Sequence, residues 1–441
     1  MLKRRLQLAS AAACLVALTT CRSAEVETKV VILGFDGAGW ETIDPLIEAG
    51  KLPYLERMRA ASAWAPLQTF KPTKSPVIWT SIATGKSMLK HGILDFVYLE
   101  QNEIQIPYSN SEKREPSLWQ ILDRFDRRSA IINWFVTYPP DQIDGIMVSN
   151  RFRKTLLLQG ERADGMQDTV HPPERFAELK QFIDRDYEAG LAETSLPDLK
   201  QLYLQRHPGK SPDDIEVLKD FWIYVLQEVL NERVASHLYE NEDVDLFAAY
   251  FRLPDIVQHF ALELLDPTFV EETLAAIRNG DMTPERHRAF NEQMSLVLEP
   301  FYRYMERILE HYATAPGNEK THIVVVSDHG FTLHRGGYDH YHIPDEEPAP
   351  SGIFMMHGPQ VRPGRLSSAS VYDIAPTLLY LYDLPIGETM DGRPLTEALT
   401  VERAIRTERY GRALITTREN RRDEEIDAQT LKELRSLGYI Q

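Results

Sequence analysis

The chain of 441 residues has a formal net charge of −17, and 43% of its residues are hydrophobic. This length leaves room for one large α/β domain with insertions or for two domains, and the hydrophobic content is enough for a sizeable core. The acidic balance argues against non-specific nucleic-acid binding, which depends on basic side chains. It does not exclude a phosphate substrate, because bound cations would dominate the local field.

Residues 1–20 are predicted to be a signal peptide. A basic start at residues 3–5 precedes an apolar stretch at residues 6–18 that is too short to span a bilayer. The following string, LTTCRSAE, resembles a bacterial lipoprotein signal in which Cys21 becomes the lipidated first residue. We therefore expect an exported protein of the bacterial cell envelope, in the periplasm or held at the membrane by a lipid anchor. Ordinary cleavage near Ala24 and an uncleaved anchor are the alternatives.

The two cysteines of the chain, Cys14 and Cys21, both lie in this N-terminal region. Cys14 would be removed with the signal, and Cys21 is the lipidation position. The exported domain therefore has no disulfide and no thiol nucleophile, which excludes cysteine-based catalysis and a cysteine-held structural zinc.

Apolar runs and helical stretches alternate along the rest of the chain. We expect buried strands at residues 29–35, 128–134, 245–251, 322–328 and 352–357, and helices at residues 41–61, 117–126, 218–240 and 290–312. This alternation predicts an α/β fold with a mostly parallel central sheet and helices on both faces. In such sheets, ligands bind beyond the carboxyl ends of the strands.

Residues 28–400 are predicted to form this main domain. Within it, residues 153–216 are charged and helix-prone and contain Pro and Gly interruptions, which indicates a helical cap insertion over the site. Residues 401–441 are predicted to be a C-terminal helical extension, in which a charged helix at 421–436 packs on the main domain.

Acidic residues end two of the predicted strands. Asp36 closes VVILGFDG and is followed by a glycine turn, a pattern that alone usually means only a turn. Asp328 and His329 close HIVVVSDHG, where a buried carboxylate must be hydrogen-bonded or metal-bound because unpaired burial is costly. The turn at Gly330 lets these two side chains converge on one ion, although a hydrogen-bonded turn is the simpler alternative.

Ser75 precedes Pro76 at the start of a predicted helix. Serine at the N-cap and proline at the first helical position form an ordinary helix start. The same geometry presents a hydroxyl at the positive end of the helix, where phosphate binds and where a metal would activate the hydroxyl as a nucleophile.

Asp255 and His259 lie four residues apart in LPDIVQHF, just past a predicted strand. They share one helix face and could reach one ion, although isolated pairs of this spacing are mostly surface pairs or caps. A late cluster in YDHYHIPDE adds His340 and His342, one of which would complete a set of ligands.

Carboxylates and imidazoles from distant segments, together with a hydroxyl, indicate two divalent metals beside a nucleophile, and so phosphoryl or sulfuryl transfer. This mixture of ligands favours zinc, with manganese or iron as alternatives.

These motifs resemble the type I phosphodiesterase/nucleotide pyrophosphatase branch of the alkaline phosphatase superfamily. The strings that carry the resemblance span residues 31–394 in the family's order and are FDGAGW, PTKSPVIWTSIATGKSMLKHGILDF, PDIVQH, VVVSDHGF and SVYDIAPTLLYLYDLPIGETMDGRPL. The resemblance implies that the main domain is an alkaline-phosphatase-like catalytic domain. It also implies that Asp36, Ser75, Asp328 and His329 surround one metal, and that Asp255, His259 and a late histidine surround the other.

The resemblance favours His342 over His340 as that late histidine, and it places Ser75 at the nucleophile position. It implies a two-metal phosphoester hydrolase that forms a phosphoseryl intermediate on a small-molecule or lipid substrate. A phosphomonoesterase, a phospho-head-group transferase and a non-catalytic envelope lipoprotein are the alternatives. The chain departs from nucleotide-cleaving relatives at Phe96, where they carry an asparagine, and it lacks the arginine that sulfatases carry after the nucleophile.

Overall fold

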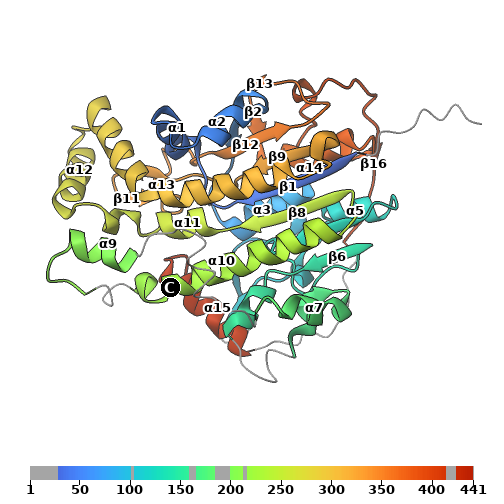
Figure 1. Ribbon diagram of the computed structural model, residues 1–441, viewed down its shortest axis with the longest axis horizontal. Helices are drawn as coiled ribbons and strands as arrows, with labels where there is room; N and C mark the ends of the chain where they lie inside the picture. The colour runs from blue at the N-terminus through green and yellow to red at the C-terminus, as the bar shows by residue number, and fades with distance from the viewer. Residues whose placement is uncertain are drawn as a thin grey trace, which may run out of the picture.

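The computed structural model describes residues 28–100, 104–157, 165–183, 199–211, 216–413 and 424–440. In these residues, a ten-stranded sheet forms the centre of the molecule (Figure 1). Its strand order is β13-β2-β12-β9-β1-β8-β5-β6-β7, and β14 pairs with β2. The strands are β1 (Lys29–Phe35), β2 (Ala63–Gln68), β5 (Ser129–Ile132), β6 (Gly145–Val148), β7 (Val170–His171), β8 (Leu246–Phe251), β9 (Thr321–Val326), β12 (Gly352–His357), β13 (Gly364–Arg365) and β14 (Ala369–Ser370).

The central strands of this sheet are parallel. Strand β1 pairs in parallel with β8 on one side and β9 on the other, so that Val30 lies opposite both Leu246 and His322. Strand β12 runs antiparallel to β9 and β2, and β7 runs antiparallel to β6. The expected α/β fold with a mostly parallel central sheet is therefore confirmed. Three short pairs lie outside it: β3 (Val97–Leu99) with β4 (Gln105–Pro107), β10 (Thr332–His334) with β11 (Gly337–Asp339), and β15 (Ile386–Gly387) with β16 (Thr407–Glu408).

Helices cover both faces of the sheet, because successive side chains of each strand point to opposite sides. On one face, Val31 and Leu33 of β1 share a core with α1 (Trp40–Glu48), α10 (Glu216–Asn241), α11 (Leu253–Gln258) and α13 (Pro284–Thr314). On the other face, Val30 and Ile32 share a core with α3 (Ser75–Thr84), α5 (Leu118–Asp123) and α14 (Ile374–Leu381). The remaining α-helices are α2 (Pro53–Ala60), α4 (Met88–His91), α7 (Phe176–Lys180), α9 (Leu199–Arg206), α12 (Pro267–Asn279) and α15 (Glu424–Ser436).

The helix expected over residues 41–61 is two helices, α1 and α2. The chain turns between them at Gly50, whose φ of 68° is readily adopted only by glycine, and Pro53 then starts α2. The helix expected from residue 290 instead begins at Pro284, where the Thr283 side chain accepts a hydrogen bond from the Arg286 amide.

The signal peptide and the lipidation position Cys21 lie outside the described residues. Parts of the 153–216 segment and of the 401–441 segment also lie outside them, so the cap insertion and the C-terminal extension remain predictions. Among the described helices, none combines the length and the apolar character needed to cross a membrane.

Candidate active site

The candidate site lies where three parallel strands end. Asp36 follows β1, Asp255 lies in α11 just after β8, and Asp328 follows β9. Because β1, β8 and β9 run in parallel, their carboxyl ends meet at one edge of the sheet. Gly37 permits the close approach of these segments. It has a φ of 70°, and a Cβ added there would come within 2.8 Å of the Asp255 Cα.

Helix α3 places Ser75 beside Asp36. The helix begins at Ser75, and Lys74 rather than Ser75 is its N-cap residue, one position earlier than expected. The helix packs tightly on β1, because a Cβ added to Gly34 would come within 2.7 Å of the Trp79 ring. This packing fixes the first turn of α3 over the end of β1.

Four of the expected residues form a first cluster, the Ser75 group, which consists of Asp36, Ser75, Asp328 and His329. The Ser75 Oγ lies 3.4 Å from the Asp36 Oδ1 and 3.5 Å from the His329 Nε2. The His329 Nε2 in turn lies 3.4 Å from the Asp36 Oδ1 and 3.4 Å from the Asp328 Oδ2. All four residues are buried.

A second cluster, the His340 group, consists of Asp255, His259 and His340. The His259 Nε2 lies 3.4 Å from the Asp255 Oδ1 and 3.3 Å from the His340 Nε2. The His340 Nε2 lies 3.6 Å from the Asp255 Oδ1. The His329 and His340 rings stack with centroids 3.7 Å apart, so the two groups adjoin.

The choice of His342 over His340 was wrong. The side chain of His342 is 66% exposed, and its Nδ1 lies 2.8 Å from the Asp339 Oδ2, outside the His340 group. The cause is the turn after β11, in which the Asp339 carboxylate accepts the backbone N–H groups of His340, Tyr341 and His342. This turn directs residue 340 inward and leaves residue 342 on the surface.

The spacing of the donor atoms fits metal binding. In each group the facing donors are 3.3–3.6 Å apart. A tetrahedral ion with bonds of roughly 2.0–2.1 Å separates its ligands by about 3.3 Å. The Asp255 Oδ1 and the Asp328 Oδ2 are buried and have no hydrogen-bond partner among the described residues, although each faces a histidine nitrogen. Such orphaned carboxylate oxygens are costly unless a cation binds them.

The electrostatics of Asp36 and Asp328 indicate the same need for a cation. Burial, and then the negative charge of Asp255, raises the pKa of Asp36 to about 7. Burial and the charge of Asp36 raise the pKa of Asp328 well above its usual range. Burial also lowers the pKa of His329 to about 4, which keeps its imidazole neutral, as a metal ligand must be. The residues present therefore fit divalent metals.

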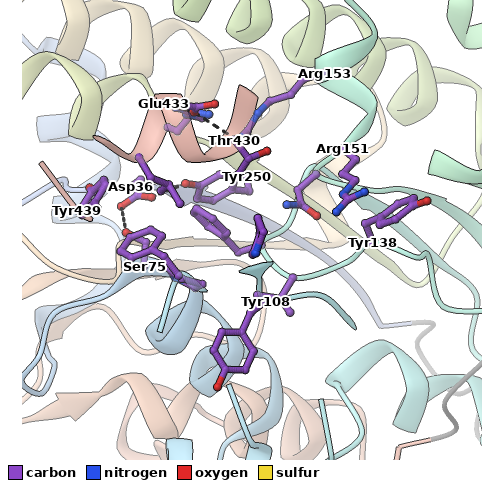
Figure 2. Close-up of a pocket in the computed structure, with 18 of the residues that line it drawn as sticks. Asp36, Ser75, Tyr108, Tyr138, Arg151, Arg153, Tyr250, Thr430, Glu433 and Tyr439 are labelled. Atoms are coloured by element: carbon purple, nitrogen blue, oxygen red, sulfur yellow. Dashed lines mark hydrogen bonds and ion pairs between the residues drawn. The ribbon is translucent and has the colours of Figure 1, made fainter. Parts of the chain in front are cut away.

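Two tyrosines of the site were not anticipated. The Tyr250 hydroxyl, at the end of β8, donates a hydrogen bond to the Asp36 Oδ2 (Figure 2). The Tyr439 hydroxyl, just after α15, donates to the Asp255 Oδ2 at 2.9 Å and lies 2.7 Å from the His259 Nε2 and 3.2 Å from the His340 Nε2. Neither had a sequence signal, because a strand tyrosine usually reads as core and a lone tyrosine near a helix end reads as packing.

A pocket opens beside Ser75 and continues away from the two groups (Figure 2). Phe96 and Tyr439 form part of its wall, with ring centroids 4.3 Å apart. Phe96 thus packs against a residue from the far end of the chain. In the nucleotide-cleaving relatives an asparagine is expected at the position of Phe96. The pocket volume is about 70 Å³, which is small for a ligand site because drug-sized ligands occupy roughly 300–1,000 Å³.

Comparison with solved structures shows that this chain shares its fold with a 2-O GAG sulfatase at low sequence identity. A 2-O GAG sulfatase is 10% identical, with a TM-score of 0.53 over 87% of this chain and 76% of its own. The murine ectonucleotide pyrophosphatase/phosphodiesterase 5 is 11% identical, with a TM-score of 0.46 over 84% of this chain and 100% of its own. A phosphonate monoester hydrolase from Silicibacter pomeroyi is 14% identical, with a TM-score of 0.46 over 86% of this chain and 77% of its own. Among curated protein sequences, none matches this chain.

The match of most of the chain to a family of phosphodiesterases and nucleotide pyrophosphatases defines its class as a hydrolytic enzyme that acts on phosphoesters. The family model for type I phosphodiesterase / nucleotide pyrophosphatase matches residues 30–356, most of the chain. The chain belongs to this family.

Proposed function

We propose that this protein is a two-metal phosphoester hydrolase with Ser75 as its nucleophile, acting on phosphodiesters. The observation that carries the proposal is the position of the Ser75 hydroxyl, 3.4 Å from the Asp36 Oδ1 and 3.5 Å from the His329 Nε2. A buried serine has no structural need for a carboxylate and an imidazole beside it. A nucleophile that must be deprotonated does.

The Ser75 group and the His340 group would each hold one divalent ion, zinc being favoured by the mixture of imidazole and carboxylate ligands. When bound, the ions supply Lewis-acid chemistry: they lower the pKa of a hydroxyl or water and offset charge on the phosphoryl group.

The residues of the chain then account for a two-step displacement. Ser75 loses its hydroxyl proton and its Oγ forms a bond to phosphorus while the bond to the leaving alkoxide breaks; the alkoxide leaves as the alcohol, and a phosphoseryl intermediate remains. Water next attacks the same phosphorus, the bond to Ser75 Oγ breaks, and a phosphomonoester is released. Asp36 aligns the Ser75 hydroxyl as its hydrogen-bond acceptor, and Tyr250 holds the other oxygen of that carboxylate. The start of α3 favours negative charge on the group that Ser75 carries.

The experiment compares Ser75→Ala with Ser81→Ala, a buried serine two turns along the same helix that bonds to His91. Turnover of bis(p-nitrophenyl) phosphate should fall at least about a thousandfold in Ser75→Ala, because the residual rate then comes from binding and electrostatics alone. Ser81→Ala should change it only severalfold. Acid quenching of the wild-type reaction should trap a phosphate on the Ser75 peptide, as detected by mass spectrometry. Normal turnover in Ser75→Ala would contradict the assignment.

Three further substrates separate the alternatives. Faster cleavage of p-nitrophenyl phosphate than of the diester would make the protein a phosphomonoesterase. Product transfer to added glycerol would make it a transferase. Cleavage of p-nitrophenyl sulfate would make it a sulfatase.

We also propose that the protein is an exported lipoprotein, on the strength of the N-terminal string LTTCRSAE. The Cys21→Ser variant should then move from the membrane fraction to the soluble fraction and lose labelling by radioactive palmitate. Equal fractionation of both forms would contradict lipidation.

A further inference from the structure

Three basic side chains lie around one carboxylate in the wall of the pocket. Arg153 and Lys154 belong to the 3-10 helix η2 (Phe152–Leu157), and Arg252 follows β8. Lys154 Nζ and Arg252 Nη2 form ion pairs with Glu433 of α15, and Arg153 Nη2 lies 3.7 Å from its Oε1. We call Arg153, Lys154 and Arg252 the cation group.

The cation group is buried and carries more charge than Glu433 offsets. The three basic side chains are at most 9% exposed. Glu228, the next carboxylate, accepts the backbone N–H groups of Arg252 and Leu253. Burial raises the pKa of Glu228 to about 7, so it offers only part of a charge near neutral pH. Among the described residues, Glu433 is therefore the carboxylate that forms ion pairs with all three cations, and the charge of Asp36 acts on Arg252 besides.

The surplus positive charge is accompanied by guanidinium nitrogens that lack a hydrogen-bond partner. The Arg153 Nε and the Arg252 Nη1 are buried and have no hydrogen-bond partner among the described residues. Burial lowers the pKa of Lys154 to about 8 even though Glu433 lies beside it. Because an unpaired buried charge is costly, this arrangement indicates that a further anion completes it.

The place of the cation group indicates which anion. Arg153, Lys154 and Arg252 line the same pocket as Ser75 and Asp255. Figure 2 shows Arg153 and Ser75 in this pocket. A ligand held at Ser75 through one phosphoryl group would extend into this pocket. A second negative group on that ligand would lie beside the cation group.

An anchor for α15 is the simpler explanation, and it accounts for only part of the geometry. One carboxylate needs one or two cations to hold a helix in place, and surplus cations weaken such an anchor through their mutual repulsion. The two orphaned guanidinium nitrogens contribute nothing to it.

We propose that the cation group is an anion-binding subsite that selects phosphoesters carrying a second negatively charged group, either a phosphate or a carboxylate. The inference rests on the proposed function, since it takes the first phosphoryl group to bind at Ser75. Glu433 occupies part of the subsite and competes with the ligand for it. Guanidinium groups suit both anions, because they donate two parallel N–H bonds to either.

The test measures equilibrium binding to the metal-loaded Ser75→Ala variant by isothermal titration calorimetry, so it does not depend on turnover. The ligands are propyl phosphate, 1,3-propanediol bisphosphate and 3-phosphooxypropionate. The two ligands with a second anionic group should bind at least about tenfold more tightly than propyl phosphate, which is the gain expected from one added charge-assisted contact. A preference for the bisphosphate alone assigns the subsite to phosphate, and an equal preference for both assigns it to either anion.

Two variants then locate the preference. Adding Lys154→Met should reduce the ratio of affinities about tenfold, while the matched change Lys320→Met, at an exposed lysine far along the chain, should leave it unchanged. Glu433→Gln should raise the ratio, because it removes the competing carboxylate. A lower ratio in Lys154→Met and a higher ratio in Glu433→Gln distinguish an effect on binding from a loss of folding, which would weaken the binding of all three ligands alike.

Equal affinity for all three ligands, or a lower ratio in Glu433→Gln, would overturn the proposal. Absence of turnover in the wild-type protein would refute the proposed function, but it would leave these binding ratios as the measure of the subsite.

Discussion

The two ends of the pocket beside Ser75 carry buried charge of opposite sign. Asp36 and Asp255 line one end, with Asp328 buried beside Asp36, and the cation group lines the other. The acidic end contains the orphaned oxygens of Asp255 and Asp328 and the neutral imidazole of His329, which a metal ion would satisfy. The basic end already contains Glu433, a partner from the chain itself. The acidic end therefore depends on an ion from solution, whereas the basic end is partly satisfied when the chain folds.

This difference predicts opposite responses to removal of one charge. Truncating one partner of a buried ion pair destabilises a protein, because the remaining charge stays buried. Removing one of several like charges that lack a counter-ion relieves repulsion instead. The following variants test whether the two ends differ in this way.

The largest effect is expected for Glu433→Gln, which leaves three buried cations without their carboxylate. The free energy of unfolding should fall by about 3–5 kcal/mol at pH 7, as measured by urea denaturation. Burial opposes ionisation of Glu433, but the charges of Arg252, Lys154 and Arg153 outweigh it and hold the pKa of the carboxyl below its usual 4.5. A lowered pKa stabilises the folded state above about pH 4.5, and this contribution is lost as the pH falls further. The difference between variant and wild type should therefore shrink below pH 4.5, and a difference independent of pH would contradict the ion pair.

The next effect concerns which histidine belongs to the acidic end. His340→Ala removes one of three donors and should weaken binding of the second metal roughly a hundredfold, equivalent to about 2.7 kcal/mol. His342→Ala, the matched change two residues away, should leave metal affinity within about twofold of wild type, because that side chain pairs with Asp339 on the surface. Metal titration followed by mass spectrometry measures both. A stronger effect of His342→Ala would reverse the assignment.

A smaller effect, of opposite sign to the first, is expected for Asp36→Asn in metal-free protein. The raised pKa of Asp36, about 7, means that its stabilising contribution is present below about pH 3.8 and is lost as the pH rises through 7. At pH 8 and in the presence of a chelator, Asp36→Asn should therefore raise the free energy of unfolding by about 1–3 kcal/mol. In metal-loaded protein, Asp36→Asn should instead lower the free energy of unfolding.

Urea denaturation with and without chelator provides the measurement for Asp36→Asn, and Asp281→Asn at an exposed position is the control. A loss of stability in the metal-free Asp36→Asn variant would mean that the acidic end is satisfied without an ion.

The smallest effect is expected for Tyr439→Phe, which keeps the ring against Phe96 and removes only the hydroxyl bonded to Asp255. Metal-free stability should fall by about 1 kcal/mol, the usual worth of one hydrogen bond. Tyr382→Phe removes a hydroxyl bonded to the Asp245 carbonyl and should cost a similar amount. Only Tyr439→Phe should also change turnover of the diester probe. An effect on turnover from both variants would reduce the role of Tyr439 to general stability.

Most of the fold and most of the Ser75 and His340 groups could be predicted because their signals are local. The apolar run of β9 ends directly at Asp328, and the spacing of Asp255 and His259 follows from one helical turn. The residues at strand ends then had to meet, because parallel strands share one carboxyl edge. The break between α1 and α2 was missed because Gly50 inside a helical pattern is tolerated often enough to be passed over.

The remaining site residues depend on contacts that no local pattern contains. The choice between His340 and His342 is set by how Asp339 closes a turn. Lys154 and Glu433 meet across 279 positions of sequence, and Tyr439 meets Asp255 across 184. Side chains brought together over such separations look like ordinary surface charges or packing residues until the fold is known.

Glu433 has one further consequence for what the pocket admits. A carboxylate fixed to the protein is present at its binding place at a far higher effective concentration than any small anion in solution. Acetate or chloride makes no second contact with the protein, so it would not displace the Glu433 carboxylate. A ligand that is also bound at Ser75 competes with Glu433 at a similar effective concentration, because both are then held next to the cation group. On the proposed subsite, Glu433 of α15 would therefore exclude the simple salts of the surrounding medium.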